Sequence, residues 1–201
     1  MDNRRLAVLL SGRGSNFLAI HDAIARGDLR AMIACVISNV EDAPGILRAR
    51  ELGLTAACLP SKRIPRTDYD RILIAALEPF DQALICLAGF MRVLSPEFIA
   101  HYRGRIVNIH PALLPSFPGL HAQRLAIEYG VKITGCTVHL VDEGVDTGRI
   151  LKQRAVEVID GDTEDALSTR ILRQEHDIYW RAIAGLLDGK FTPAAGAPHI
   201  M

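Results

Sequence analysis

The chain has 201 residues, of which 49% are hydrophobic and 23% are charged, so its composition excludes disordered and collagen-like proteins. A chain of this length buries about 70% of its unfolded surface as one domain and needs no metal or disulfide to fold. Lysine plus arginine equals aspartate plus glutamate at 23 each, which argues against a nucleic-acid binder or a protein of anionic membrane surfaces but leaves room for a local anion pocket.

The N-terminal segment has the short apolar run LAVLL, which is shorter than a signal-peptide core or a membrane span. The cysteines lie too far apart for the Cys-x-x-Cys pairs of metal and redox sites. They are Cys35, Cys58, Cys86 and Cys136. We therefore expect buried free thiols, a cytoplasmic location and no membrane partner.

Apolar runs rich in β-branched residues alternate with helical patterns along the chain. The sequence predicts strands at residues 6–10, 32–37, 55–59, 83–88, 105–109, 133–141 and 150–158. It predicts helices at residues 16–26, 43–52, 67–77, 96–101, 123–129 and 163–187. Strands that are apolar on both faces and joined by helices indicate a parallel sheet covered on both sides. Only DEGVDTG joins the last two strands, so we expect an antiparallel pair there.

A glycine-rich turn, LLSGRGSN at residues 9–16, joins the first predicted strand to the first predicted helix. Backbone amides at a helix N-terminus bind anions, and Ser15 or Asn16 can cap the helix or donate to a phosphate oxygen. The turn has neither the spacing of a dinucleotide fingerprint nor the Gly-Lys of a P-loop, so a monophosphate is the better-sized ligand. A tight turn without any ligand explains this local sequence equally well.

Asn108 and His110, in VNIHP, lie two residues apart on a predicted strand, so their side chains project from the same face at its carboxyl end. Open α/β sheets bind ligands at this edge. A histidine transfers protons near neutral pH and an amide can donate to a developing oxyanion, so the pair suits acyl-type transfer. A histidine at a strand end is more often structural, and this segment alone leaves both roles open.

The segment GCTVHLVDEGVDTG, residues 135–148, adds an acidic turn after the sixth predicted strand. Such turns are usually solvated loops. If this one folds over the edge that carries His110, Asp146 would hold the imidazole as a cation and raise its pKa above about 6.5. His110, His121 and His139 match no common zinc spacing, and we expect no metal site.

Two further segments carry candidate binding residues. LAGFMRVLSP, residues 87–96, places apolar side chains beside Arg92, which form either core or the wall of a slot for a flat heterocycle. QEHDIYW, residues 174–180, is typical of an amphipathic helix, with Glu175 in solvent and Tyr179 and Trp180 packed inside.

Together these segments resemble the phosphoribosylglycinamide formyltransferase family, folate-dependent enzymes of purine synthesis. The matching runs are LLSGRGSN, the SN at Ser38 and Asn39, LAGFMRVLS, VNIHPALLPSFPGLHA, GCTVHLVDEGVDTG and DTEDALSTRILRQEH. The resemblance implies an α/β, Rossmann-like fold with a mostly parallel sheet of about seven strands. It implies one domain at residues 1–190, with a mononucleotide-binding half at about 1–100, a folate and catalytic half at about 101–190, and a loose tail at 191–201.

The resemblance also implies a reaction, in which a formyl group passes from 10-formyltetrahydrofolate to the primary amine of glycinamide ribonucleotide. Asn108 and His110 would stabilise a tetrahedral intermediate, and Asp146 would assist proton transfer. The residues that would bind the ribonucleotide are Gly14, Ser15, Asn16 and Glu175. The residues that would bind the folate are Arg66, Met91, Arg92, Val93, Leu94, Asn108, Asp142, Glu143, Gly144, Val145 and Asp146. Neither a metal nor a nicotinamide has a role.

Two positions depart from the family pattern: Arg149 stands where a proline is frequent, and Leu172 where a polar substrate contact occurs. Formyltetrahydrofolate hydrolase shares the Asn, His and Asp trio but carries an N-terminal regulatory domain, for which a first strand near Arg5 leaves no room. A catalytically silent folate or nucleotide-binding module of the same fold is a further alternative, which loss of the trio would have favoured. We expect small-molecule substrates, no nucleic acid, and a monomer or homodimer.

Overall fold

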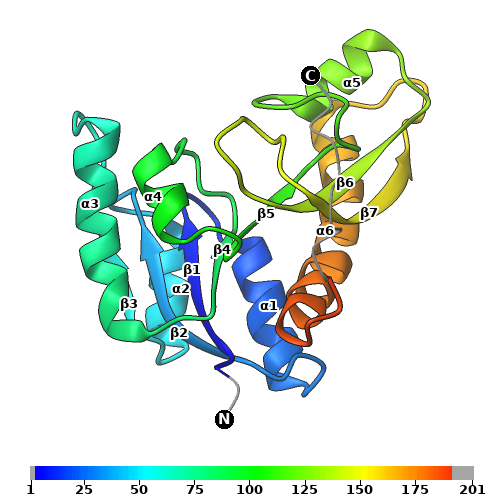
Figure 1. Cartoon of the computed structure of the whole chain (residues 1–201). Helices are drawn as coiled ribbons and strands as arrows, with labels where there is room; N and C mark the ends of the chain where they lie inside the picture. Colours follow the sequence, from blue (N-terminus) through cyan, green and yellow to red (C-terminus); the bar gives the residue numbers. More distant parts are fainter. Residues whose placement is uncertain (1–2, 192–201) are drawn as a thin grey trace.

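The computed structural model describes residues 3–191, which form a seven-stranded sheet with helices on both faces (Figure 1). The strands are β1 (Arg5–Leu10), β2 (Met32–Ser38), β3 (Ala56–Cys58), β4 (Leu84–Leu87), β5 (Ile106–His110), β6 (Ile133–Leu140) and β7 (Ile150–Glu157). The helices are α1 (Ser15–Ala25), α2 (Pro44–Glu51), α3 (Arg66–Leu77), the 3-10 turn η1 (Glu78–Phe80), α4 (Pro96–His101), α5 (Ala122–Tyr129) and α6 (Glu164–Leu187). The predicted loose tail lies, except for Phe191, outside the described residues.

The strand order is β3-β2-β1-β4-β5-β6-β7. The first five strands pair in parallel, and β6 and β7 pair antiparallel, as their sequence patterns predict. The direction already reverses between β5 and β6, which the sequence did not indicate. The turn η1 was also not predicted. None of the helices within residues 3–191 is long and apolar enough to cross a membrane.

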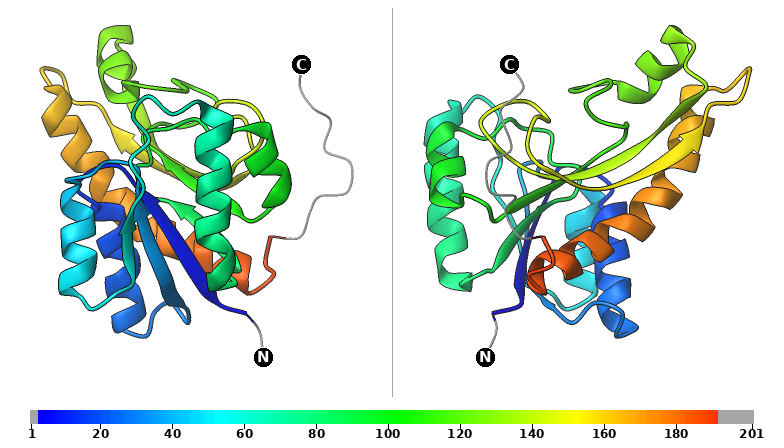
Figure 2. Two further views of the ribbon diagram at one scale, coloured as in Figure 1. Left: turned by 90° about the vertical axis from the view of Figure 1, so that its left-hand side faces the viewer. Right: turned by 45° about the vertical axis from the view of Figure 1, so that its right-hand side comes forward.

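Alternation along β1 divides the core into two layers. Leu6, Val8 and Leu10 face the layer built with α1, α2 and α6, whereas Ala7 and Leu9 face the layer built with α3 and α4. Figure 2 shows these helices on opposite sides of the sheet. Because both faces of the central strands are covered, their continuous apolar sequences follow directly from their place in the sheet.

The sheet has a topological switch point beside β1. Its neighbours are β2 on one side and β4 on the other, so the chain leaves the carboxyl ends of β1 and β4 toward opposite faces. Such a crevice is the usual ligand position in open α/β sheets. The segments that follow β1, β4 and β5 therefore meet at one edge, and they are the segments that carry the candidate site residues.

One buried hydroxyl ties α6 to the middle of the sheet. The Tyr179 hydroxyl lies 2.9 Å from the Leu87 carbonyl oxygen and 3.0 Å from that of Val107, and it donates its proton to this pair. We expect Tyr179→Phe to lower the free energy of unfolding by about 1 to 2 kcal/mol, because a buried hydrogen bond is lost without a change of volume. Urea denaturation measures this. Tyr129→Phe, at a ring that is 80% exposed, is the control, and equal effects of the two variants would contradict the assignment.

Candidate active site

Three predicted site residues meet at the carboxyl edge of β5. Asn108 and His110 are on β5 itself, and the turn between β6 and β7 brings in Asp146. Asp146 Oδ2 lies 3.2 Å from His110 Nδ1 and accepts a hydrogen bond of 2.8 Å from the backbone amide of Gly119. Asp146 Oδ1 lies 3.5 Å from Asn108 Nδ2. The structure therefore joins an amide, an imidazole and a carboxylate in one cluster.

The backbone selects which nitrogen of His110 titrates. His110 Nε2 lies 2.8 Å from the carbonyl oxygen of Phe117. Because a carbonyl only accepts hydrogen bonds, Nε2 carries a proton, and Nδ1 is the nitrogen that gains or loses one. Nδ1 is also the nitrogen that faces Asp146. The ring is thus oriented so that proton exchange occurs beside the carboxylate.

Burial decides the protonation state of this histidine. Burial lowers the pKa of His110 by more than the charge of Asp146 and the Phe117 carbonyl raise it, so its pKa is below the ordinary 6.5. Asp146 raises the pKa of His110, but the expectation that this pKa lies above 6.5 is wrong, because the His110 residue is only 4% exposed and burial outweighs that charge. Burial also raises the pKa of Asp146, but the surrounding His139 ring, Gly119 amide and His110 ring bring it below 3.8. At neutral pH a neutral imidazole therefore lies beside a carboxylate.

A second histidine holds the Asn108 amide. His139 on β6 lies directly opposite Asn108 in the antiparallel register. Its Nδ1 lies 2.8 Å from the Leu140 carbonyl oxygen and carries a proton, so in the neutral ring Nε2 accepts from Asn108 Nδ2 at 3.1 Å. From the sequence, His139 was considered only as a metal ligand, so its contact with Asn108 was not predicted. Within residues 3–191, no group of three or more His, Cys, Asp or Glu side chains is placed to hold a metal ion.

The glycine-rich turn leads into α1 without a side-chain cap. Gly14 is the N-cap residue and has a φ of 75°, so the predicted capping by Ser15 or Asn16 is wrong. Both residues instead lie in the first turn of α1. Because a glycine N-cap supplies no side-chain acceptor, the first amides of α1 are a suitable site for an anion.

The first turn of α1 contacts the middle of α6 through Glu175. Asn16 Nδ2 donates to Glu175 Oε2 at 2.7 Å. Glu175 is 6% exposed, so its expected position in solvent is wrong. Burial raises the pKa of its carboxyl, against the opposing hydrogen bond from Asn16. A buried carboxyl group therefore lies beside the candidate anion site, bonded to a residue of the first turn of α1.

A cavity of about 420 Å³ lies next to the cluster. The predicted folate residues that line it are Met91, Arg92, Val93, Leu94, Asn108, Asp142, Glu143, Gly144, Val145 and Asp146. His110, Leu120 and His121 also line it. Leu120, which is 70% exposed in the loop after β5, was not among the predicted binding residues. The cavity joins apolar walls to the polar cluster, as expected for a slot that holds a heterocycle.

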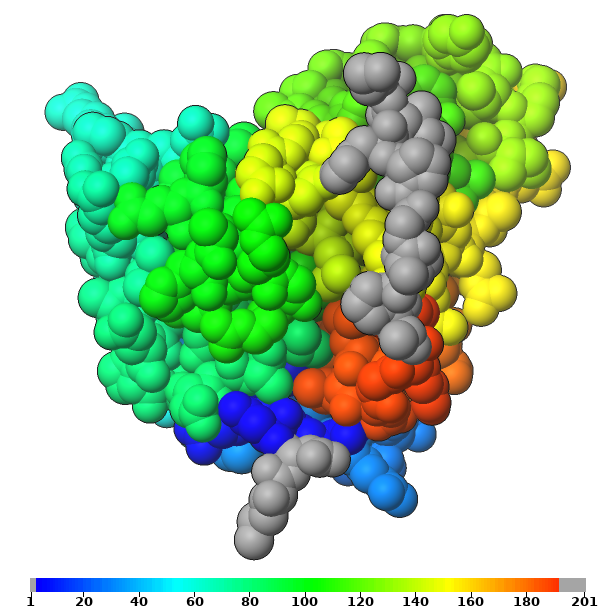
Figure 3. Space-filling model, in the orientation of Figure 1, coloured from blue at the N-terminus to red at the C-terminus, as the bar shows by residue number. Residues whose placement is uncertain are grey.

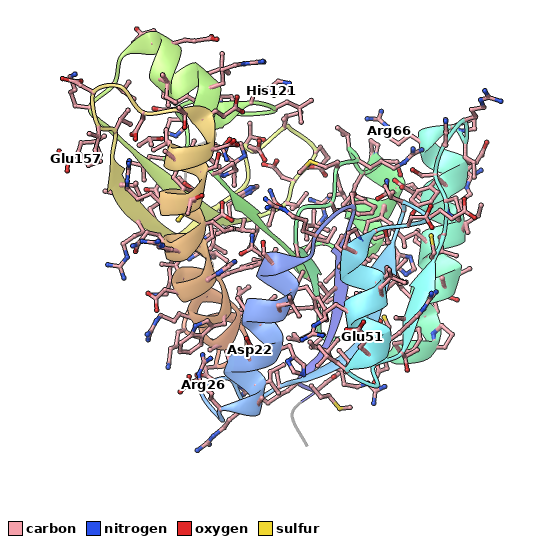
Figure 4. All side chains as sticks on the ribbon, turned by 180° about the vertical axis from the view of Figure 1, so that it is seen from behind. Asp22, Arg26, Glu51, Arg66, His121 and Glu157 are labelled. Carbon is pink, nitrogen blue, oxygen red and sulfur yellow. The ribbon has the colours of Figure 1, made fainter. Side chains whose placement is uncertain are left out.

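Two arginines differ from the expectation for this cavity. Arg66 begins α3 and is not among the lining residues. Figure 4 shows Arg66 and His121 at the same end of the molecule, on separate lobes, and the outline is indented between these lobes in Figure 3. The Arg92 guanidinium donates to the carbonyl oxygens of Ser61 and Ile64, so it is directed into the protein.

Comparison with known proteins agrees with this architecture. Residues 4–183 match the formyl transferase family. The chain is 43% identical over 186 residues to phosphoribosylglycinamide formyltransferase of Escherichia coli (strain K12), over 92% of this chain and 88% of that protein. It is 48% identical over 190 residues to trifunctional purine biosynthetic protein adenosine-3 of Drosophila melanogaster, over 92% of this chain but 14% of that protein. The chain thus spans a small part of such trifunctional relatives.

A solved structure is similar over nearly the whole chain. Glycinamide ribonucleotide transformylase 1 from Symbiobacterium toebii is 45% identical and superposes with a TM-score of 0.91, covering 94% of this chain and 89% of that one. The family match at residues 4–183 spans all seven strands and the candidate site. The chain therefore belongs to the formyl transferase family.

Proposed function

We propose that this protein transfers a formyl group from 10-formyltetrahydrofolate to the primary amine of glycinamide ribonucleotide, in purine biosynthesis. The observation that carries the proposal is the position of Asn108, His110 and Asp146 at one end of the cavity. Relatives named phosphoribosylglycinamide formyltransferase support the choice of acceptor. The substrates are small molecules, and we place the reaction in the cytoplasm because the four cysteines are unpaired thiols.

The geometry suits a direct transfer through a tetrahedral intermediate. The substrate amine attacks the formyl carbon, and the negative charge that develops on the formyl oxygen accepts a hydrogen bond from Asn108 Nδ2. The attacking nitrogen gives up a proton to the pair formed by Asp146 and neutral His110. The proton comes to lie on His110 Nδ1, 3.2 Å from Asp146 Oδ2, and the carboxylate stabilises the resulting imidazolium. The same proton then passes to the folate nitrogen as its bond to the formyl carbon breaks. The products are the formamide of the ribonucleotide and tetrahydrofolate.

The two substrates occupy neighbouring parts of the switch-point crevice. The ribonucleotide phosphate binds at the first turn of α1, through Gly14, Ser15 and Asn16, and Glu175 accepts from the ribose hydroxyls. The folate heterocycle lies in the cavity between the segment after β4 and the turn at residues 142–146. Arg66, which begins α3 outside the residues that line the cavity, pairs with a carboxylate of the folate tail.

Incubation of the protein with 10-formyltetrahydrofolate, with and without glycinamide ribonucleotide, tests the function. Tetrahydrofolate is expected to form only when the ribonucleotide is present. Equal release without the ribonucleotide would identify a hydrolase instead, and no release under either condition would identify a silent binding module.

The glycine-rich turn at residues 9–16, named the phosphate turn below, packs closely against Gly45. A Cβ atom at Gly45 would lie 2.9 Å from Leu10 Cδ2, 3.0 Å from the Gly12 carbonyl oxygen and 3.1 Å from Gly14 Cα. We expect Gly45→Ala to displace this turn and to raise the KM for the ribonucleotide by about 10-fold, equivalent to about 1.4 kcal/mol. Steady-state kinetics with each substrate varied in turn measures this. A KM that rises only for the folate would contradict the placement.

A further inference from the structure

The Ser11 side chain connects the phosphate turn to the wall of the cavity. Ser11 is the first residue after β1, and its backbone amide donates to the Gly89 carbonyl oxygen at 3.0 Å. Its hydroxyl accepts a hydrogen bond of 2.7 Å from the backbone amide of Met91, a residue that lines the cavity. One hydroxyl thus belongs to the turn that leads to Gly14 and also holds the cavity wall.

Asn39 fixes the direction of the Ser11 hydroxyl. The Asn39 amide nitrogen donates to the Ser61 hydroxyl at 3.0 Å, so its Oδ1 accepts the proton of Ser11 at 2.5 Å. With that proton engaged, the Ser11 oxygen presents its lone pairs to the Met91 amide. Asn39 and Ser61 are both at most 9% exposed, so water competes weakly for the bond between them, whereas the bond from the Met91 amide to Ser11 lies at the surface.

The same network reaches the far side of the cavity wall. Arg92 donates to the Ser61 carbonyl oxygen at 3.2 Å, and its guanidinium lies 4.6 Å from the centre of the Tyr69 ring. The Met91 backbone is therefore held from one side by Ser11 and from the other by the fixed side chain of the next residue. A displacement of the phosphate turn therefore either moves Met91 or breaks the hydrogen bond between the Met91 amide and the Ser11 hydroxyl.

The geometry points to Ser11 and Asn39 as positioning residues that couple the two substrate sites. Neither side chain binds a substrate in this account. An anion that orders the turn after β1 also orders the Ser11 hydroxyl. The ordered hydroxyl fixes the Met91 amide, so the cavity wall at Met91 is already in place when folate binds. By linkage, bound folate strengthens anion binding by the same factor. This inference rests on the proposed function, because it takes the two sites to be those of the ribonucleotide and the folate.

Binding measurements without turnover test this coupling. Calorimetric titration gives the Kd of tetrahydrofolate, which has no formyl group to transfer, with and without saturating glycinamide ribonucleotide. In the wild-type protein we expect the ribonucleotide to tighten tetrahydrofolate by about fivefold or more, and in Ser11→Ala by less than about twofold. Ser11→Thr keeps the hydroxyl and is expected to restore most of the coupling.

Ser38→Ala is the matched control. Ser38 is fully buried beside Asn39, and its hydroxyl bonds with the amide and carbonyl of Val40, within its own turn. We expect this variant to keep the wild-type ratio of the two Kd values. Two outcomes overturn the coupling and leave the proposed function intact. In one, Ser11→Ala keeps the wild-type ratio of the tetrahydrofolate Kd values. In the other, the wild-type protein binds both ligands but its ratio is near one. Failure of the wild-type protein to bind either ligand overturns both.

Discussion

His110→Ala is expected to lower kcat for formyl transfer by about 100-fold or more while the fold is retained. The imidazole is the group in the described cluster that is poised to take a proton from the attacking amine, since its Nδ1 faces Asp146 and its Nε2 is held by the Phe117 carbonyl. Alanine supplies no base for this proton. Both KM values are expected to change much less than kcat, because the cavity walls and the α1 turn are unaltered.

The matched control for this variant is His101→Ala. His101 is an exposed residue of α4, and its loss is expected to leave kcat unchanged. Circular dichroism and thermal unfolding check that both variants fold. If His110→Ala turned over at a near-normal rate, another group would have to carry the proton, and the assignment of His110 would be wrong.

Asp146→Asn is expected to lower kcat on the order of 100-fold and to shift the pH dependence of the reaction. Asparagine suits this position in shape, because the residue has a φ of 56° and Asn tolerates that backbone conformation better than most residues. The substitution therefore removes the charge with little backbone strain. Without the carboxylate, the imidazolium that forms at His110 loses its counter-charge.

The direction of the pH shift follows from the causes of the His110 pKa. The active form of His110 is neutral, so kcat falls as the pH drops through its pKa, which burial places below 6.5. The Asp146 charge opposes burial and raises this pKa. Its removal is expected to lower the pKa further and to move the acid limb of the profile to lower pH. A limb that moves to higher pH in Asp146→Asn would contradict the proposed pairing.

Local sequence patterns were sufficient to predict most of the strands and helices of the fold. The apolar runs of β1, β2 and β4 reflect burial on both faces of these strands, which leaves a direct signal in the sequence. The polar residues of β6 do not mark a solvent face, because residues 134–139 are all buried. The reversal at β6 left no such signal, because an antiparallel neighbour of β5 has the same apolar faces as a parallel one. The position of His139 opposite Asn108 depends on that reversal, and it was missed for the same reason.

The site required contacts between distant segments. Glu175 has the local sequence of a solvated helix residue and is buried because α6 packs on α1, where Asn16, 159 residues earlier, donates to it. The lowered pKa of His110 likewise depends on the burial of its ring. The sequence could identify which residues to examine, but desolvation is a property of the assembled edge of the sheet.

The most direct measurement of the proposed reaction follows the formyl carbon itself. The protein is incubated with 10-formyltetrahydrofolate labelled with ¹³C in the formyl group and with glycinamide ribonucleotide, and the products are identified by NMR and mass spectrometry. The label is expected to appear in a formamide of the ribonucleotide, in one-to-one yield with tetrahydrofolate, and His110→Ala is expected to suppress both products together. Label recovered as free formate, with the ribonucleotide unchanged, would contradict the proposed reaction.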